Sequence, residues 1–167
     1  MRISGGGAGN VNVLQSDAGQ FRNRDFITAQ DGAFMCGLVL GGDSAVYSHI
    51  GMHNINGGGV TLLIDEIIIT VASDMTIVLA SYDTVLANNV GPWKCLHTSG
   101  AAGNSRLAWE RSAGTLGTSY GELDVLAGRP LTVSFPTPLE VDDDDGFHVH
   151  GQTVNVGIGV IFKGREV

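Results

Sequence analysis

The sequence is a series of short apolar runs separated by turn residues, and none of the runs repeats with the period of a helix. Glycine, asparagine and aspartate stand between the runs and tolerate the backbone conformations of tight turns. About nine such segments favour an all-β protein, a two-sheet antiparallel sandwich. The expected strands are 33–40, 45–53, 60–71, 75–82, 105–111, 119–125, 131–135, 147–150 and 153–162. We expect at most one helical turn, at residues 84–89.

Two of these strands carry more specific expectations. Residues 75–82 are moderately apolar on both faces, which predicts a central strand. In 60–71, Asp65 and Glu66 are adjacent, so a regular strand would point one carboxylate to each face. A bulge, an edge position or a partner contact is needed to accommodate one of them.

The chain divides into a polar N-terminal segment and an apolar body. Its 167 residues fit one domain. Residues 1–31 are rich in Gly, Asn, Gln, Asp and Arg, which predicts an extended arm, and residues 32–167 are expected to form the sandwich. Residues 1–24 hold three arginines against one aspartate, a net charge of +2, whereas the whole chain carries −8. We expect the arm to bind a partner through Arg2, Phe21, Arg22 and Arg24.

The charge and cysteine content exclude several classes of partner. A net charge of −8 with two lysines argues against nucleic acid or an anionic membrane, since both need clustered basic residues. The most apolar stretch, 60–71, contains two acids and is too short to span a bilayer, and from the first residues we expect no export signal. Cys36 and Cys95 are expected to be reduced, buried thiols in a reducing compartment.

A pair of histidines is the sharpest candidate for metal chemistry. His148 and His150 would share one face of a strand, where both imidazoles could hold zinc or iron in a cupin-type site. Such a site also needs a third histidine and a carboxylate shortly downstream, and residues 151–155 supply neither. We therefore expect no metal and no cofactor, with His148 and His150 as the residues that would have to carry one.

Other constellations have a functional and a structural interpretation. The run Asp142, Asp143, Asp144 and Asp145 before Gly146 could bind a cation between subunits, but its spacing is not that of a calcium loop and favours a solvated turn. Glu110 with Glu122 or Asp124 could form a glycosidase-type carboxylate pair. Trp93 and Trp109 could stack on sugars or pack in the core. None of these patterns predicts an enzyme.

The stretch from Tyr47 to the C-terminus resembles a group of small structural proteins of tailed bacteriophages, jelly-roll-like modules attached to the virion. Glu66, where the group carries a basic residue, and the acidic turn at 142–145 depart from its pattern. The resemblance implies no catalytic residues. The segments that carry it are 47–50, 52–54, 57–65, 82–86, 100–102, 110–112, 116–118, 138–139, 145–149 and 164–166.

This resemblance and the charge split lead to one functional expectation. We expect a virion structural protein, assembled in the host cytoplasm, that decorates and cements a capsid by binding the major capsid protein or other virion subunits. A homo-oligomer, with a trimer as the first guess, would suit the threefold sites of such shells. The alternatives are a tail or fibre component that binds a host glycan and, less favoured, a cupin-like metalloprotein.

Overall fold

The computed structural model describes residues 33–55, 59–94 and 102–167, and these residues form ten strands and no helix. The prediction of an all-β protein is confirmed. The predicted arm, with Arg2, Phe21, Arg22 and Arg24, lies outside the described residues, as does Cys95. The strands are β1 (Ala33–Leu40), β2 (Tyr47–His53), β3 (Leu62–Val71), β4 (Met75–Ser81), β5 (Asn88–Lys94), β6 (Ala102–Ser112), β7 (Thr118–Val125), β8 (Leu131–Val141), β9 (Gly146–Gly151) and β10 (Ile158–Glu166).

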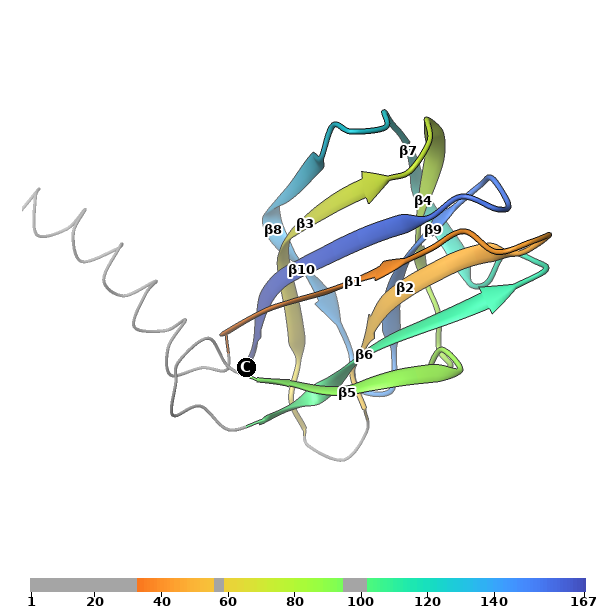
Figure 1. Ribbon diagram of the computed structural model, residues 1–167. Helices are drawn as coiled ribbons and strands as arrows, with labels where there is room; N and C mark the ends of the chain where they lie inside the picture. The colour runs from red at the N-terminus through yellow and green to blue at the C-terminus, as the bar shows by residue number, and fades with distance from the viewer. Residues whose placement is uncertain (1–32, 56–58, 95–101) are drawn as a thin grey trace, which may run out of the picture.

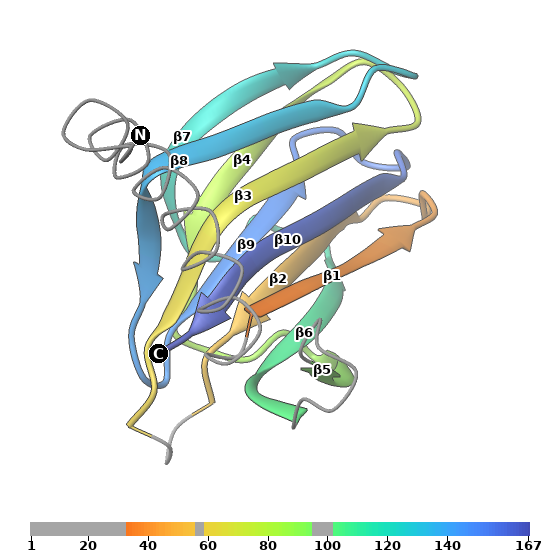
Figure 2. The same ribbon diagram turned by 90° about the vertical axis from the view of Figure 1, so that its left-hand side faces the viewer.

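The strands form two antiparallel sheets that pack face to face (Figure 1). The four-stranded sheet has the order β1-β10-β3-β8, which Figure 2 shows from its outer side, and the six-stranded sheet has the order β5-β6-β2-β9-β4-β7. With β5 and β6 set aside, the two orders become β1-β10-β3-β8 and β2-β9-β4-β7. This interleaving of early, middle and late strands is the arrangement of a jelly roll, with β5 and β6 added beside β2.

The core lies between the sheets because side chains alternate along each strand. On β2, Ile50 and Met52 point inward, and on β10 Val160 and Phe162 do the same. The Phe147 and Phe162 rings, from opposite sheets, meet edge to face with centroids 6.4 Å apart. One apolar layer therefore joins the whole sandwich. Its fully buried members include Phe34, Ile50, Met52, Leu62, Ile64, Ile67, Ile69, Ile77, Ile158 and Phe162.

The adjacent acids of β3 are accommodated by a bulge, one of the three alternatives that the sequence left open. The pairing of β3 with β8 shifts between Ile64 and Glu66. Asp65 then accepts hydrogen bonds from Arg165 Nη1 at 3.0 and 3.2 Å, and Glu66 pairs with Lys163. Both carboxylates thus find cations on the neighbouring strand β10.

Four local expectations were wrong. Residues 84–89 form no helical turn, and Asn88–Lys94, where no strand was expected, form strand β5. Strand β5 lies at a sheet edge, where its irregular pairing with β6 accommodates Gly91 and Pro92. The strand expected to end at residue 135 continues to Val141, because β8 is also an edge strand and tolerates proline. Residues 153–157 form a turn and not the start of β10.

Two connections lie over the outer face of the six-stranded sheet. In the β4–β5 connection, the Tyr82 ring packs edge-on against His148, with centroids 5.8 Å apart, and Leu86 is buried. In the β6–β7 connection, Gly117 lies against Ser81 and His148. This face is therefore covered, and polar side chains on it are removed from water.

Candidate functional site

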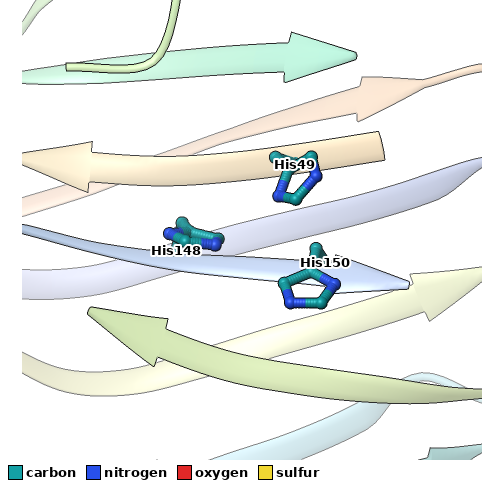
Figure 3. A group of neighbouring side chains, drawn as sticks. All are labelled: His49, His148 and His150. Carbon is teal, nitrogen blue, oxygen red and sulfur yellow. The ribbon is translucent and has the colours of Figure 1, made fainter. Parts of the chain in front are cut away.

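Three histidines converge on the covered face of the six-stranded sheet. The register of β2 and β9 places His49 directly opposite His150 and Gly51 opposite His148. Because side chains alternate, all three imidazoles project to the same side (Figure 3). One potential ligand atom from each histidine lies within 4.8 Å of the other two. The predicted placement of His148 and His150 on one face is confirmed, and His49 is a third member that the sequence did not reveal.

Small neighbours make room for this cluster, which is almost fully buried. The exposed fractions of His49, His148 and His150 are 0%, 2% and 2%. A Cβ on Gly51 would lie 2.6 Å from His148 Cβ. On the other side of β9, the residue opposite His148 is Ala80. The sheet therefore leaves a depression into which the His148 ring fits.

The β6–β7 connection closes the depression from above. Gly117 has a φ of 75°, in the left-handed region that favours glycine. A Cβ at this position would lie 1.9 Å from the Ser81 carbonyl oxygen and 3.0 Å from His148 Cε1. The connection can approach the histidines this closely only because a glycine stands there.

Several ring nitrogens of the three histidines have no hydrogen-bond partner among the described residues. Among the described residues, neither ring nitrogen of His49 nor of His148 has a hydrogen-bond partner. His150 differs, since its Nδ1 lies 3.3 Å from the Gly151 carbonyl oxygen. An unpaired buried polar group costs roughly 1–3 kcal/mol, and native proteins retain such groups only for a reason. Four unpaired nitrogens in one cluster therefore call for a functional explanation.

Burial keeps the three imidazoles neutral at physiological pH. Desolvation, followed by repulsion from neighbouring imidazoles, lowers the pKa of His49 to about 4 and that of His148 to about 3. Desolvation also lowers the pKa of His150. The backbone of Gly114 lies beside His49, and the backbone of Leu116 lies beside His148. Each acts as an acceptor that raises the pKa of its histidine and so partly opposes the effect of burial. Neither contact has the geometry of a full hydrogen bond. Each ring thus offers a nitrogen lone pair.

The acidic turn does not form a comparable cluster. Its backbone is held by Asn54, which accepts from the Asp144 N–H at 2.9 Å and donates to the Asp145 carbonyl at 2.8 Å. Asp144 itself has a φ of 69°. Within the described part of the chain, the three histidines are the one group of three or more potential ligands that converges. These hydrogen bonds join backbone groups and stabilise the turn.

The other candidates from the sequence are separated or packed away. Glu110 and Glu122 lie at opposite ends of a row across β6, β2, β9, β4 and β7, so four strand spacings place them about 19 Å apart. That separation is wrong for a glycosidase pair. Trp109 packs against the core with the Arg111 guanidinium 5.6 Å from its ring, and the side chain of Trp93 lies outside the described residues.

Cys36 is a free cysteine that points into the core. Its thiol lies 3.4 Å from Met52 Sδ. Burial raises the pKa of this thiol to about 12. The raised pKa agrees with a thiol that is not activated, and the expected reduced state of both cysteines stays a prediction, since Cys95 lies outside the described residues.

The outer face of the four-stranded sheet presents a second feature that the sequence did not reveal. Met35, Val39 and Ile161 are 52%, 77% and 39% exposed there. They line a shallow groove of about 620 Å³ whose floor includes Gly37 and Gly159. The strand β1, at the edge of the sheet, has no charged residue. We call Met35, Gly37, Val39, Gly159 and Ile161 the β1 patch.

Comparisons with known proteins add no relative. Neither protein-family models, nor curated proteins, nor solved structures gave a significant match to this chain. Among the described residues, no helix has the length and apolar character needed to cross a membrane.

Proposed function

We propose that this chain is a structural subunit of a bacteriophage virion, a capsid decoration or cement protein that works through contacts between subunits. The observation that carries the proposal is the β1 patch. Exposed methionine, valine and isoleucine side chains gathered on one face are typical of a protein–protein interface. An edge strand without charged residues also lacks the usual protection against association.

The jelly-roll fold is compatible with this function but does not distinguish it from other functions. Jelly rolls occur in viral capsid proteins, and also in lectins and in cupins. Because one fold serves many functions, the choice rests on surface chemistry. The β1 patch is suited to bind a protein surface, whereas Tyr120, at 63%, is the one exposed aromatic side chain that the described residues offer to a sugar.

Charge adds a second argument. Within the four-stranded sheet, the charged residues Asp65, Glu66, Lys163 and Arg165 pair with one another beside the β1 patch. Their mutual pairing leaves the patch itself apolar. Residues 1–24, with a net charge of +2, precede β1 in the chain and are proposed to contact an adjacent subunit or the acidic body of another copy.

The test measures retention on phage heads that lack the protein. Val39→Lys places a charge in the β1 patch and should reduce the amount that cosediments with heads by at least about tenfold, with folding stability unchanged within about 0.5 kcal/mol. Leu126→Lys is the matched control, since Leu126 is 49% exposed and lies outside the patch. Deletion of residues 1–24 tests the arm in the same assay.

The outcomes separate the alternatives. Loss of retention with Val39→Lys but not with Leu126→Lys supports the proposal. Equal retention of wild type, Val39→Lys and the deletion would contradict it. Failure of the wild type to bind heads, together with binding on a glycan array, would replace it with the tail or fibre alternative.

A further inference from the structure

The cluster of buried histidines points to a site for which the proposed function has no use. We propose that His49, His148 and His150 together bind one divalent transition-metal ion, Zn²⁺ or an ion with the same preference for imidazole nitrogen. The ion would be a structural centre that ties β2 and β9 to the β6–β7 connection.

The donor set selects the class of ion. Three neutral imidazoles suit Zn²⁺, Cu²⁺, Ni²⁺ or Fe²⁺. Calcium and magnesium need several oxygen ligands, and the converging group contains none from a carboxylate. The absence of a cysteine in that group argues equally against a thiolate site. Zinc with three histidines is an established coordination, with a small molecule such as water as the fourth ligand.

The distances fit after a small movement. Zinc–nitrogen bonds of about 2.0–2.1 Å in a tetrahedron set neighbouring nitrogens about 3.4 Å apart. The potential ligand atoms here lie within 4.8 Å of one another, so the longest separation must shorten by about 1.4 Å. Rotation of the imidazole rings about their side-chain bonds supplies a movement of this size without a change in the strands.

Backbone groups are in place to orient each ring. A metal-bound histidine usually donates its second ring N–H to a carboxylate, a carbonyl or water. The Gly151 carbonyl lies 3.3 Å from His150 Nδ1. The backbone of Gly114 lies beside His49 and that of Leu116 beside His148, where each favours a protonated ring nitrogen. Two of the three orienting groups thus come from the β6–β7 connection.

The surroundings favour a structural over a catalytic ion. Of the three histidines, only His148 lines the adjoining hollow, which has a volume of about 10 Å³. That is room for about one water molecule and no substrate. The ion would lie between the three imidazoles and take one nitrogen from each ring, while the second nitrogens of His49 and His148 face the backbone of Gly114 and Leu116.

The experiment uses the full-length chain without a histidine tag. The protein is purified, its metal content is measured by inductively coupled plasma mass spectrometry, and it is then stripped with EDTA and titrated with Zn²⁺. We expect one equivalent to bind and, at 100-fold excess over the dissociation constant, the melting temperature to rise by roughly 5–10 °C. Co²⁺ should give the intense visible bands of a tetrahedral nitrogen site.

Variants identify the ligands. His49→Gln and His148→Gln should each weaken Zn²⁺ binding by at least about 100-fold. His53→Gln is the matched control, because His53 lies on the same face of β2, is 4% exposed and also has an unpaired Nδ1, yet is not part of the cluster. Long-range nitrogen NMR of the wild type, which needs no variant to fold, should show Zn²⁺ shifting the ring nitrogens of these three histidines. Absence of Zn²⁺ and Co²⁺ binding, or equal effects of His53→Gln and His148→Gln, would overturn the proposal.

Discussion

The two outer faces of the sandwich both depart from an ordinary protein surface, one by burying polar side chains and the other by exposing apolar ones. The six-stranded sheet buries three histidines under two connections, whereas the four-stranded sheet leaves Met35 and Val39 exposed. Polar rings are usually found outside and large apolar side chains inside. The contrast teaches that the two faces suit different kinds of partner. A metal ion is proposed for the first face and an apolar protein surface for the second.

The largest expected effect is on the rate at which the Cys36 thiol is alkylated, which reports how stably β1 is paired in the four-stranded sheet. Cys36 follows the exposed Met35 yet points inward, and burial raises the pKa of its thiol from the ordinary 9.0 to about 12. At pH 8 the thiolate fraction falls from about one in ten to about one in ten thousand, so alkylation should be about 1,000-fold slower than in the unfolded chain.

A Cys95→Ser background isolates this thiol, and iodoacetamide labelling followed by mass spectrometry measures the rate. Rapid labelling in the native state would mean that β1 detaches readily. In that case the exposure of Met35 and Val39 would reflect a loose strand and not a binding surface.

The next prediction tests whether the small residue Gly51 is needed for the depression that holds the His148 ring. Gly51→Ala places a Cβ 2.6 Å from His148 Cβ and 2.8 Å from the Phe147 carbonyl oxygen. We expect a loss of about 3 kcal/mol in the free energy of unfolding, measured with urea in EDTA, together with weaker Zn²⁺ binding. Gly121→Ala on β7, where no atom lies within 4 Å of the new Cβ, is the control. Equal stability of the two variants would show that the histidines are not tightly enclosed.

A smaller effect comes from acid acting on the metal-free chain. Desolvation lowers the pKa of His49 to about 4 and of His148 to about 3, whereas the unfolded imidazoles titrate near 6.5. Below pH 6.5 the unfolded state therefore binds more protons than the native state, and stability decreases as the pH falls. We expect a loss of roughly 2.5 kcal/mol, shared between the two imidazoles, between pH 7 and pH 5.5.

Urea unfolding across this pH range measures the effect. The His49→Gln/His148→Gln double variant should have a shallower dependence on pH than the wild type, and His53→Gln should resemble the wild type more closely. Identical profiles for the wild type and the double variant would mean that these imidazoles are accessible to water.

Sequence patterns predicted most of the fold for a simple physical reason. Alternation of apolar residues and the chemistry of turns are local, so most strands could be anticipated, as could an irregularity at Asp65 and Glu66, for which a bulge was one of three alternatives. Edge strands were harder to predict. Gly91 and Pro92 indicate a turn when considered locally, but an edge strand such as β5 tolerates both.

The candidate site was only half predictable. His148 and His150 are two residues apart, so their shared face follows from the strand period. His49 joins them through the register of β2 against β9, a contact between distant parts of the chain that no local pattern specifies. One signal was present: His49, Gly51 and His53 alternate along β2, which indicates a polar face with a gap. The cover provided by the β6–β7 connection could not be anticipated.

The most direct test of the contrast between the two faces is native mass spectrometry of the untagged, full-length chain after addition of Zn²⁺. One spectrum reports both the number of subunits and the mass of bound ions. We propose that copies of this chain associate through the β1 patch and that retention on heads depends on this assembly. We therefore predict an oligomer, with a trimer expected, that carries one ion per chain and becomes monomeric with Val39→Lys while it keeps the ion. A metal-free monomer would contradict the account on both faces, a metal-free oligomer would remove the histidine site, and a metal-bound monomer would remove self-association through the β1 patch.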